Sequence, residues 1–307
     1  MCVSLLQTAK RGSNAGCLGF LIHSIALFAP VLAVVLPAAA PAQEARPEHP
    51  VTKSRFDTEH IFGFGEGSDF GPMGEYEIES FTVGIFGAAG SNFKVGNETS
   101  LRYSIIDGLR LSAGALTDYL NLHNLSGLSA RNGLNVNGII TEVRWNIFNR
   151  LISPFGMTLS MNPEWRRTDP ASGRYNDNFA VTTALLIDKE VIPDKFFMEL
   201  NLVYSPFWLP ASGRLLRNDS FTFLVGGSYV ITPDILVGAE IRHENLARNG
   251  SPISHALFVG PHLFLQLDED FTASFAWAFQ IPDLGARHAD LANFERYEAG
   301  LRLIYSF

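Results

Sequence analysis

Apolar and polar residues alternate along most of this chain, in segments of about ten residues. In the last segment, Leu301, Leu303 and Tyr305 share one parity, and Glu298 and Arg302 share the other. Successive side chains of a β-strand point to opposite faces, so the pattern predicts strands with one apolar and one polar face. We expect an all-β chain, because no comparable helical periodicity occurs over the same residues.

Twelve such segments follow one another, an even number. The predicted strands cover residues 75–87, 91–106, 109–120, 134–148, 154–165, 177–188, 195–207, 220–231, 235–244, 255–266, 271–281 and 294–307. Short turns such as Asp107-Gly108 and 268–270 alternate with longer connections rich in Asn, Ser, Gly and Arg. The predicted long connections are 121–133, 166–176, 208–219, 245–254 and 282–293. This alternation is typical of an outer-membrane barrel, which has tight periplasmic turns and longer external loops.

The composition excludes several other classes of protein. A hydrophobic content of 47% with 18% charged residues is incompatible with a disordered chain. A net charge of −8 argues against nucleic acid as a partner. Only two cysteines occur, Cys2 and Cys17, so disulfides do not hold the fold together.

The first 42 residues have the pattern of a secretory signal peptide. Lys10 and Arg11 precede an apolar run over 19–35, and small residues follow up to Ala42. A membrane-anchoring helix is the alternative, but prolines and a cleavage pattern make it the weaker one. The expected organisation is a signal peptide, 1–42, a Gly-rich periplasmic segment, 43–74, and a barrel, 75–307.

A soluble β-sandwich or lipocalin-like barrel would also show alternating strands. Most of the predicted strands reach the nine to eleven residues, roughly, that a tilted strand needs to cross a membrane. Within hydrocarbon every backbone polar group must be paired internally, so a spanning sheet has to close on itself. We therefore predict a closed antiparallel up-and-down transmembrane β-barrel of about twelve strands, with its apolar parity facing lipid.

The C-terminal residues support this assignment. The chain ends with Leu303, Tyr305 and Phe307 at alternate positions. This ending resembles the C-terminal signal of Gram-negative outer-membrane β-barrel proteins, and with the leader and the strand pattern the resemblance covers nearly the whole chain. It implies a location in the cell outer membrane, contact with outer-membrane lipid, and recognition of Tyr305 and Phe307 by the barrel-assembly machinery. It implies no particular activity, because such barrels include porins, enzymes and adhesins.

Charged residues on the polar parity are the candidates for lining the lumen. They are Lys94, Glu98, Arg102, Arg110, Asp118, Glu142, Arg144, Glu164, Glu199, Glu240, Arg242, Glu298 and Arg302, and the same parity includes Arg296. Acidic and basic members nearly balance. Two interpretations remain open: a salt-bridge network that fills the lumen, or a narrow polar pathway that selects solutes.

The Gly-rich segment before the first strand also has two interpretations. Five glycines lie among residues 62–74 with Glu66 and Asp69, which indicates tight turns or close backbone approach. The favoured expectation is an ordered turn that leads into the first strand. The alternative is a periplasmic plug or partner-docking strap in which Glu66 and Asp69 hold a cation.

No residue constellation in the sequence predicts an enzyme. His262 and Ser274 flank the turn at 268–270, on the side opposite to that of known lipid hydrolases of this class. His243, His255 and His288, with Ser251 and Ser254 nearby, are expected in or near outer loops. The chain has no G-x-S-x-G or HExxH motif, and we expect no catalytic residue, cofactor or metal site.

The function predicted from these features is a passive, porin-like channel for small polar solutes. The alternative is a non-conducting structural or adhesive barrel that acts through its external loops. A lipid-modifying barrel enzyme ranks third, and an autotransporter is disfavoured because only a short segment precedes the first strand.

Overall fold

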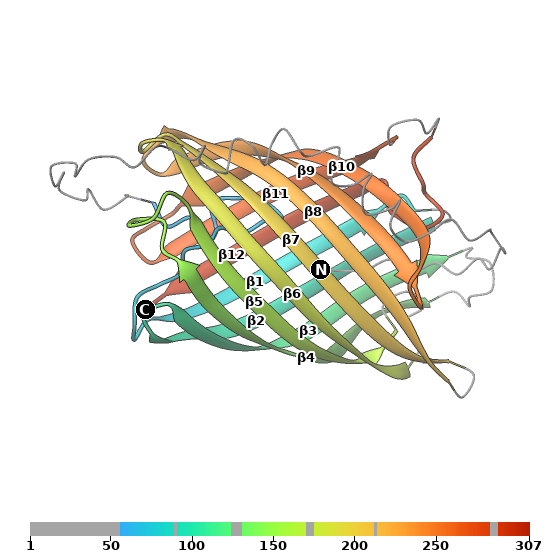
Figure 1. The fold of residues 1–307 in the computed structure, drawn as a ribbon. Helices are drawn as coiled ribbons and strands as arrows, with labels where there is room; N and C mark the ends of the chain where they lie inside the picture. The colour runs from blue at the N-terminus through green and yellow to red at the C-terminus, as the bar shows by residue number, and fades with distance from the viewer. Residues whose placement is uncertain (1–55, 89–90, 124–130, 170–174, 212–213, 283–287) are drawn as a thin grey trace, which may run out of the picture.

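The computed structural model describes residues 56–88, 91–123, 131–169, 175–211, 214–282 and 288–307. They form a single closed barrel of twelve antiparallel strands, as predicted (Figure 1). The strands are β1 (Tyr76–Phe86), β2 (Ser91–Ile106), β3 (Leu109–His123), β4 (Arg131–Phe148), β5 (Gly156–Thr168), β6 (Tyr175–Ile192), β7 (Phe196–Ala211), β8 (Arg214–Thr232), β9 (Ile235–Arg248), β10 (Ser251–Gln266), β11 (Phe271–Ile281) and β12 (Tyr297–Ser306). Within these ranges, no helix has the length and hydrophobicity to cross a membrane.

The barrel closes where the first and last strands meet. β1 pairs with β12 in antiparallel register, with Ile78 opposite Tyr305. The pairing continues to the last residue, because the Phe307 N–H donates to the Tyr76 carbonyl at 2.9 Å. Closure leaves neither strand with an unpaired edge, which is the condition for a sheet that spans hydrocarbon.

Several strands extend further than the sequence pattern indicated. β7 and β8 continue through most of 208–219, and β9 and β10 reach a tight turn at Asn249-Gly250, so the long connections predicted at 208–219 and 245–254 were wrong. Asn249 and Gly250 both have positive φ, as a two-residue hairpin turn requires. Antiparallel pairing satisfies the backbone in water as well as in lipid, so a hairpin does not have to end where its apolar pattern ends.

The outer surface of the barrel is apolar and carries aromatic rings near both ends. Tyr76 stacks on Tyr103 and on Phe307 beside the short connections, an end that we call the turn end. Phe86 and Phe93 pack together at the opposite end, the loop end. Aromatic girdles of this kind lie at the two interfaces of a membrane, and in outer-membrane barrels the short turns lie on the periplasmic side.

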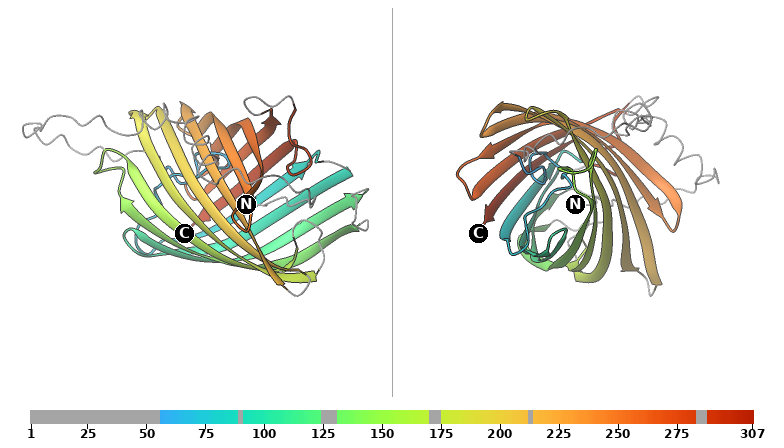
Figure 2. Two further views of the ribbon diagram at one scale, coloured as in Figure 1. Left: turned by 45° about the vertical axis from the view of Figure 1, so that its right-hand side comes forward. Right: turned by 60° about the vertical axis from the view of Figure 1, so that its left-hand side comes forward.

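Residues 56–74, which we call the inner segment, lie inside the barrel at its turn end (Figure 2). The segment folds back on itself, and the Gly67 N–H donates to the Glu59 carbonyl at 3.2 Å. The expectation of a simple periplasmic turn leading into β1 therefore does not describe these residues. Residues 1–55, with the predicted signal peptide, lie outside the described residues.

An apolar cluster holds the inner segment at the turn end. Ile61 and Phe62 are fully buried against the inward-facing Phe197 of β7, Leu236 of β9 and Phe264 of β10. Strict alternation of apolar and polar residues would make the inner wall polar throughout, but at the turn end part of the inner wall is apolar. These apolar side chains point inward because the inner segment supplies a second apolar surface that covers them.

Candidate functional site

Glu59 of the inner segment is the centre of a buried ion-pair network. Its carboxylate contacts the guanidinium groups of Arg102 at 3.0 Å, Arg144 at 2.5 Å, and Arg110. These arginines come from β2, β4 and β3, where the polar parity directs them inward. The network ties the inner segment to three consecutive strands, and buried charges persist only when they are paired in this way.

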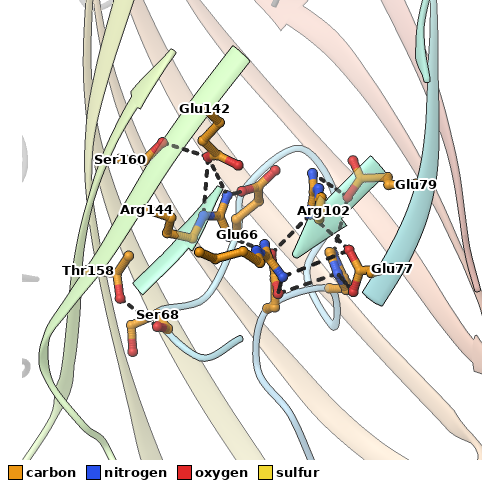
Figure 3. Close-up of polar contacts among 12 residues, drawn as sticks. Glu66, Ser68, Glu77, Glu79, Arg102, Glu142, Arg144, Thr158 and Ser160 are labelled. Carbon is orange, nitrogen blue, oxygen red and sulfur yellow. Dashed lines mark hydrogen bonds and ion pairs between the residues drawn. The ribbon is translucent and has the colours of Figure 1, made fainter. Parts of the chain in front are cut away.

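Glu66 lies at the tip of the inner segment and bridges two distant strands. Its carboxylate pairs with Arg144 of β4 and, at 3.1 Å, with Arg302 of β12 (Figure 3). Burial alone would raise the pKa of Glu66, but the two guanidinium groups outweigh this effect and hold the pKa well below its usual range. Glu66 is thus a paired carboxylate, which argues against the cation site considered from the sequence.

The backbone next to this tip is bound by a carboxylate of β9. Glu240 accepts hydrogen bonds from the N–H groups of Gly63 at 2.6 Å, Phe64 at 2.9 Å and Gly65 at 3.2 Å. Three donors on one carboxylate form a strong, charge-assisted contact. The glycines permit the close approach, because a Cβ on Gly63 would lie 2.8 Å from the His262 Cβ.

A second set of contacts fixes the base of the inner segment. Arg150, in the turn after β4, pairs with Asp69 at 2.5 Å and with Asp188 of β6 at 3.3 Å. The same guanidinium donates to the Phe56 carbonyl at 2.9 Å. Asp69 therefore anchors the segment to a turn, and it too is occupied by an arginine.

His60 lies between carboxylates at the turn end. Its Nε2 is 3.3 Å from Glu77 and 3.6 Å from Glu59. Burial opposes protonation, but these carboxylates outweigh it and raise the pKa of His60. Glu59, His60 and Glu77 have the spacing of metal ligands, yet Arg102, Arg110 and Arg144 already neutralise Glu59.

Beyond the tip, towards the loop end, the lumen holds a cavity of about 200 Å³. Phe64 and Glu66 contribute to its lining, as do charged residues of the wall such as Glu142 and Arg144. Figure 3 shows Glu142 on β4 between Arg144 and the Ser160 hydroxyl of β5. This part of the charged wall is therefore held in place by hydrogen bonds.

The structure places the sequence-predicted lumen residues in two groups. Those that line the cavity are Glu98, Arg102, Glu142, Arg144, Glu164, Arg242, Glu298 and Arg302. Those that are buried elsewhere are Lys94, Arg110, Asp118, Glu199 and Glu240. Arg110 and Glu240 contact the inner segment, whereas Asp118 pairs with Arg166 at 3.5 Å. Arg296 precedes β12 and is exposed.

His262 has a different hydroxyl partner from the one considered from the sequence. Its Nε2 lies 2.7 Å from the Ser228 hydroxyl of β8, whereas Ser274 lies opposite Phe264 and Arg302. The Ser228 hydroxyl donates to the Ile61 carbonyl at 2.8 Å, because a carbonyl can only accept. The serine proton thus points at the inner segment rather than at the histidine, and the pair serves to hold that segment.

The structure also places the histidines expected in or near the outer loops. His243 and His255 lie on the paired strands β9 and β10, with ring centroids 5.6 Å apart. His288 is exposed between β11 and β12. The strands that carry His243 and His255 continue to Asn249-Gly250, so these two histidines do not border the long connection predicted at 245–254.

Sequence reasoning missed the residues of the inner segment that bind the wall. Glu59, His60 and Ser68 carry no motif, and their partners lie far away in the chain. A weak signal was present, because the glycines at 63, 65 and 67 alternate, as close packing along an extended backbone requires.

A closed twelve-stranded barrel with an apolar exterior and a charged interior defines an outer-membrane β-barrel protein. The chain belongs to a family of unknown function, DUF6662, whose model matches residues 54–207. No curated protein matches the sequence.

Among the solved structures that are similar to this chain are outer-membrane channels and porins. An outer membrane channel of the COG4313 group from Pseudomonas putida F1 is 13% identical, with a TM-score of 0.52 over 78% of this chain and 98% of that chain. The KdgM porin is 13% identical, with a TM-score of 0.45 over 75% and 99% of the two chains. The NanC porin is 11% identical, with a TM-score of 0.46 over 75% and 98%. At 13% identity, the likeness to the channel from Pseudomonas putida F1 shows the fold alone.

Proposed function

We propose that the protein is a passive outer-membrane channel for small polar solutes, in which the inner segment narrows the periplasmic end. The observation that carries this proposal is the cavity of about 200 Å³ within the lumen, lined by charged side chains from opposite walls. Charged groups that line a water-filled lumen set which solutes enter it. The inner segment lies between the cavity and the turn end. The passage of a solute therefore depends on how firmly Glu59, Glu66 and Glu240 hold the inner segment in place.

A non-conducting barrel is the second candidate, and one observation favours it. The inner segment is held by ion pairs, by three hydrogen bonds to Glu240 and by an apolar cluster. If these contacts never open, the lumen is closed and the protein acts through its loop end.

Planar-bilayer recording of the full chain separates the two candidates. A channel gives discrete current steps, and weakening the inner segment with Glu240→Gln increases their size or frequency. A permanently closed barrel gives no steps from the wild type. Swelling of proteoliposomes in small sugars and amino acids then measures which polar solutes pass.

A further inference from the structure

The charged side chains that line the cavity differ in whether they already have an ion-pair partner, and this difference bears on the ligand that the cavity can bind. Each of its arginines already has a carboxylate partner in the structure. The pairs include Arg102 with Glu79, Arg144 with Glu142, Arg166 with Glu164, Arg242 with Glu244 and Arg302 with Glu66. An anionic ligand therefore has to displace an existing ion pair.

Glu98 of β2 is in the opposite situation. Its side chain is half-buried and lines the cavity, and no hydrogen bond or ion pair joins it to any of the described residues. The nearest arginine along its own face is Arg102, which is already held by Glu59, Glu77 and Glu79. Among the described residues, the cavity thus offers one carboxylate that forms no ion pair.

Apolar side chains flank Glu98 on the two neighbouring strands. In the strand register, Glu98 lies opposite Phe81 of β1 on one side and Leu116 of β3 on the other. Phe81, Ile85 and Ile140 also line the cavity. A partly desolvated carboxylate binds a cation more strongly than an exposed one, because water screens the attraction less.

From these features we infer that the cavity binds small organic ammonium ions, whose charged group pairs with Glu98 and whose apolar body packs against Phe81, Ile85 and Ile140. This inference rests on the proposed function, because it names the class of solute that the channel would favour. The ligand chemistry is one positive charge attached to an apolar body of aromatic or short alkyl type.

Calorimetric titration of the detergent-purified full chain tests the inference without requiring conduction. The probes are benzylammonium, neutral benzyl alcohol and anionic benzoate, which share one ring and differ in charge. We expect benzylammonium to bind more tightly than the other two. Glu98→Gln, which keeps the side-chain shape, is expected to weaken benzylammonium binding about tenfold, whereas Glu269→Gln in the exposed β10–β11 turn leaves it unchanged.

Equal affinity for the three probes would overturn the inference, as would unchanged benzylammonium binding by folded Glu98→Gln protein. The comparison among probes uses only the wild type, so it holds even if the variant does not fold. Planar-bilayer recording separates this inference from the proposed function. Current steps without preference for benzylammonium reject the inference alone, and selective binding without current steps rejects the channel alone.

Discussion

Glu240 accepts a hydrogen bond from the Gly63 N–H at 2.6 Å, across 177 residues of sequence. The contact joins the inner segment to β9, deep within the barrel. The same carboxylate also accepts from Phe64 and Gly65, so it binds three consecutive N–H groups of the segment. The position of the inner segment therefore depends on contacts with distant strands as well as on the local preferences of its own residues.

Replacing this acceptor is expected to loosen the inner segment. Glu240→Gln keeps the shape, but turns an NH₂ group towards at least one backbone donor and leaves that donor unsatisfied, at a cost of about 1–3 kcal/mol. The described residues contain no cysteine, so Ser68→Cys, at a fully buried position, supplies a unique reporter. With Cys2 and Cys17 replaced by serine, maleimide labelling of Ser68→Cys should accelerate in the Glu240→Gln background and stay slow with Glu269→Gln.

A methyl group at Gly63 tests the same contact by steric means. The new Cβ would lie 2.8 Å from the His262 Cβ and 2.9 Å from the Ala276 Cβ, and neither atom can rotate away. We expect Gly63→Ala to displace the tip and to increase labelling at Ser68→Cys. Gly133→Ala, where a Cβ meets no atom within 4 Å, is the matched control. Equal labelling in the two variants would contradict the position assigned to the segment.

Glu59 neutralises three arginines, so its loss should be costly. Glu59→Gln removes the negative charge that Arg102, Arg110 and Arg144 share. Breaking a buried ion pair typically lowers the free energy of unfolding by about 3–5 kcal/mol. The midpoint of urea unfolding in lipid vesicles should fall accordingly. A fall no larger than that of Glu269→Gln would show that the network contributes little to stability.

The pH dependence of stability should contain a contribution from His60. Its pKa is raised by Glu59 and Glu77 against the effect of burial, so the folded state favours the protonated ring. That stabilisation is complete below the unfolded pKa of about 6.5 and is lost as pH rises through the higher folded pKa. The stability difference between wild type and His60→Gln should therefore shrink with rising pH. A stability difference that does not change with pH would contradict this role of His60.

A substitution on β12 tests which face of the sheet points outward, towards lipid. Leu301 faces outward and is 43% exposed, whereas its neighbour Arg302 is buried inside. Leu301→Arg should cost about 2–4 kcal/mol, because it places a charge in hydrocarbon between the aromatic girdles. Urea unfolding from vesicles measures the loss, and Glu269→Arg controls for the added charge. A soluble sandwich would tolerate Leu301→Arg at its surface.

The alternation of residue types by itself determined the barrel. Period-two patterning assigns each side chain to one of two faces, and the requirement that hydrocarbon leaves no backbone group unpaired turns that pattern into a closed sheet. Strand number and the inward direction of residues such as Arg102 and Arg144 follow from these local rules. The ends of β7 to β10 did not follow, because a hairpin continues as long as its two strands pair, whatever the apolar pattern.

Tertiary structure alone decided what fills the lumen. Parity gave no position for Glu59, which lies in a segment without periodicity. It directed Glu98 into the lumen, but did not indicate that Glu98 would have no ion-pair partner among the described residues. Ion pairs form between side chains that the closed barrel brings together across tens to hundreds of residues, as Glu66 and Arg302 show. Which carboxylates are neutralised and which remains available is a property of that closed geometry, and no local stretch of the chain encodes it.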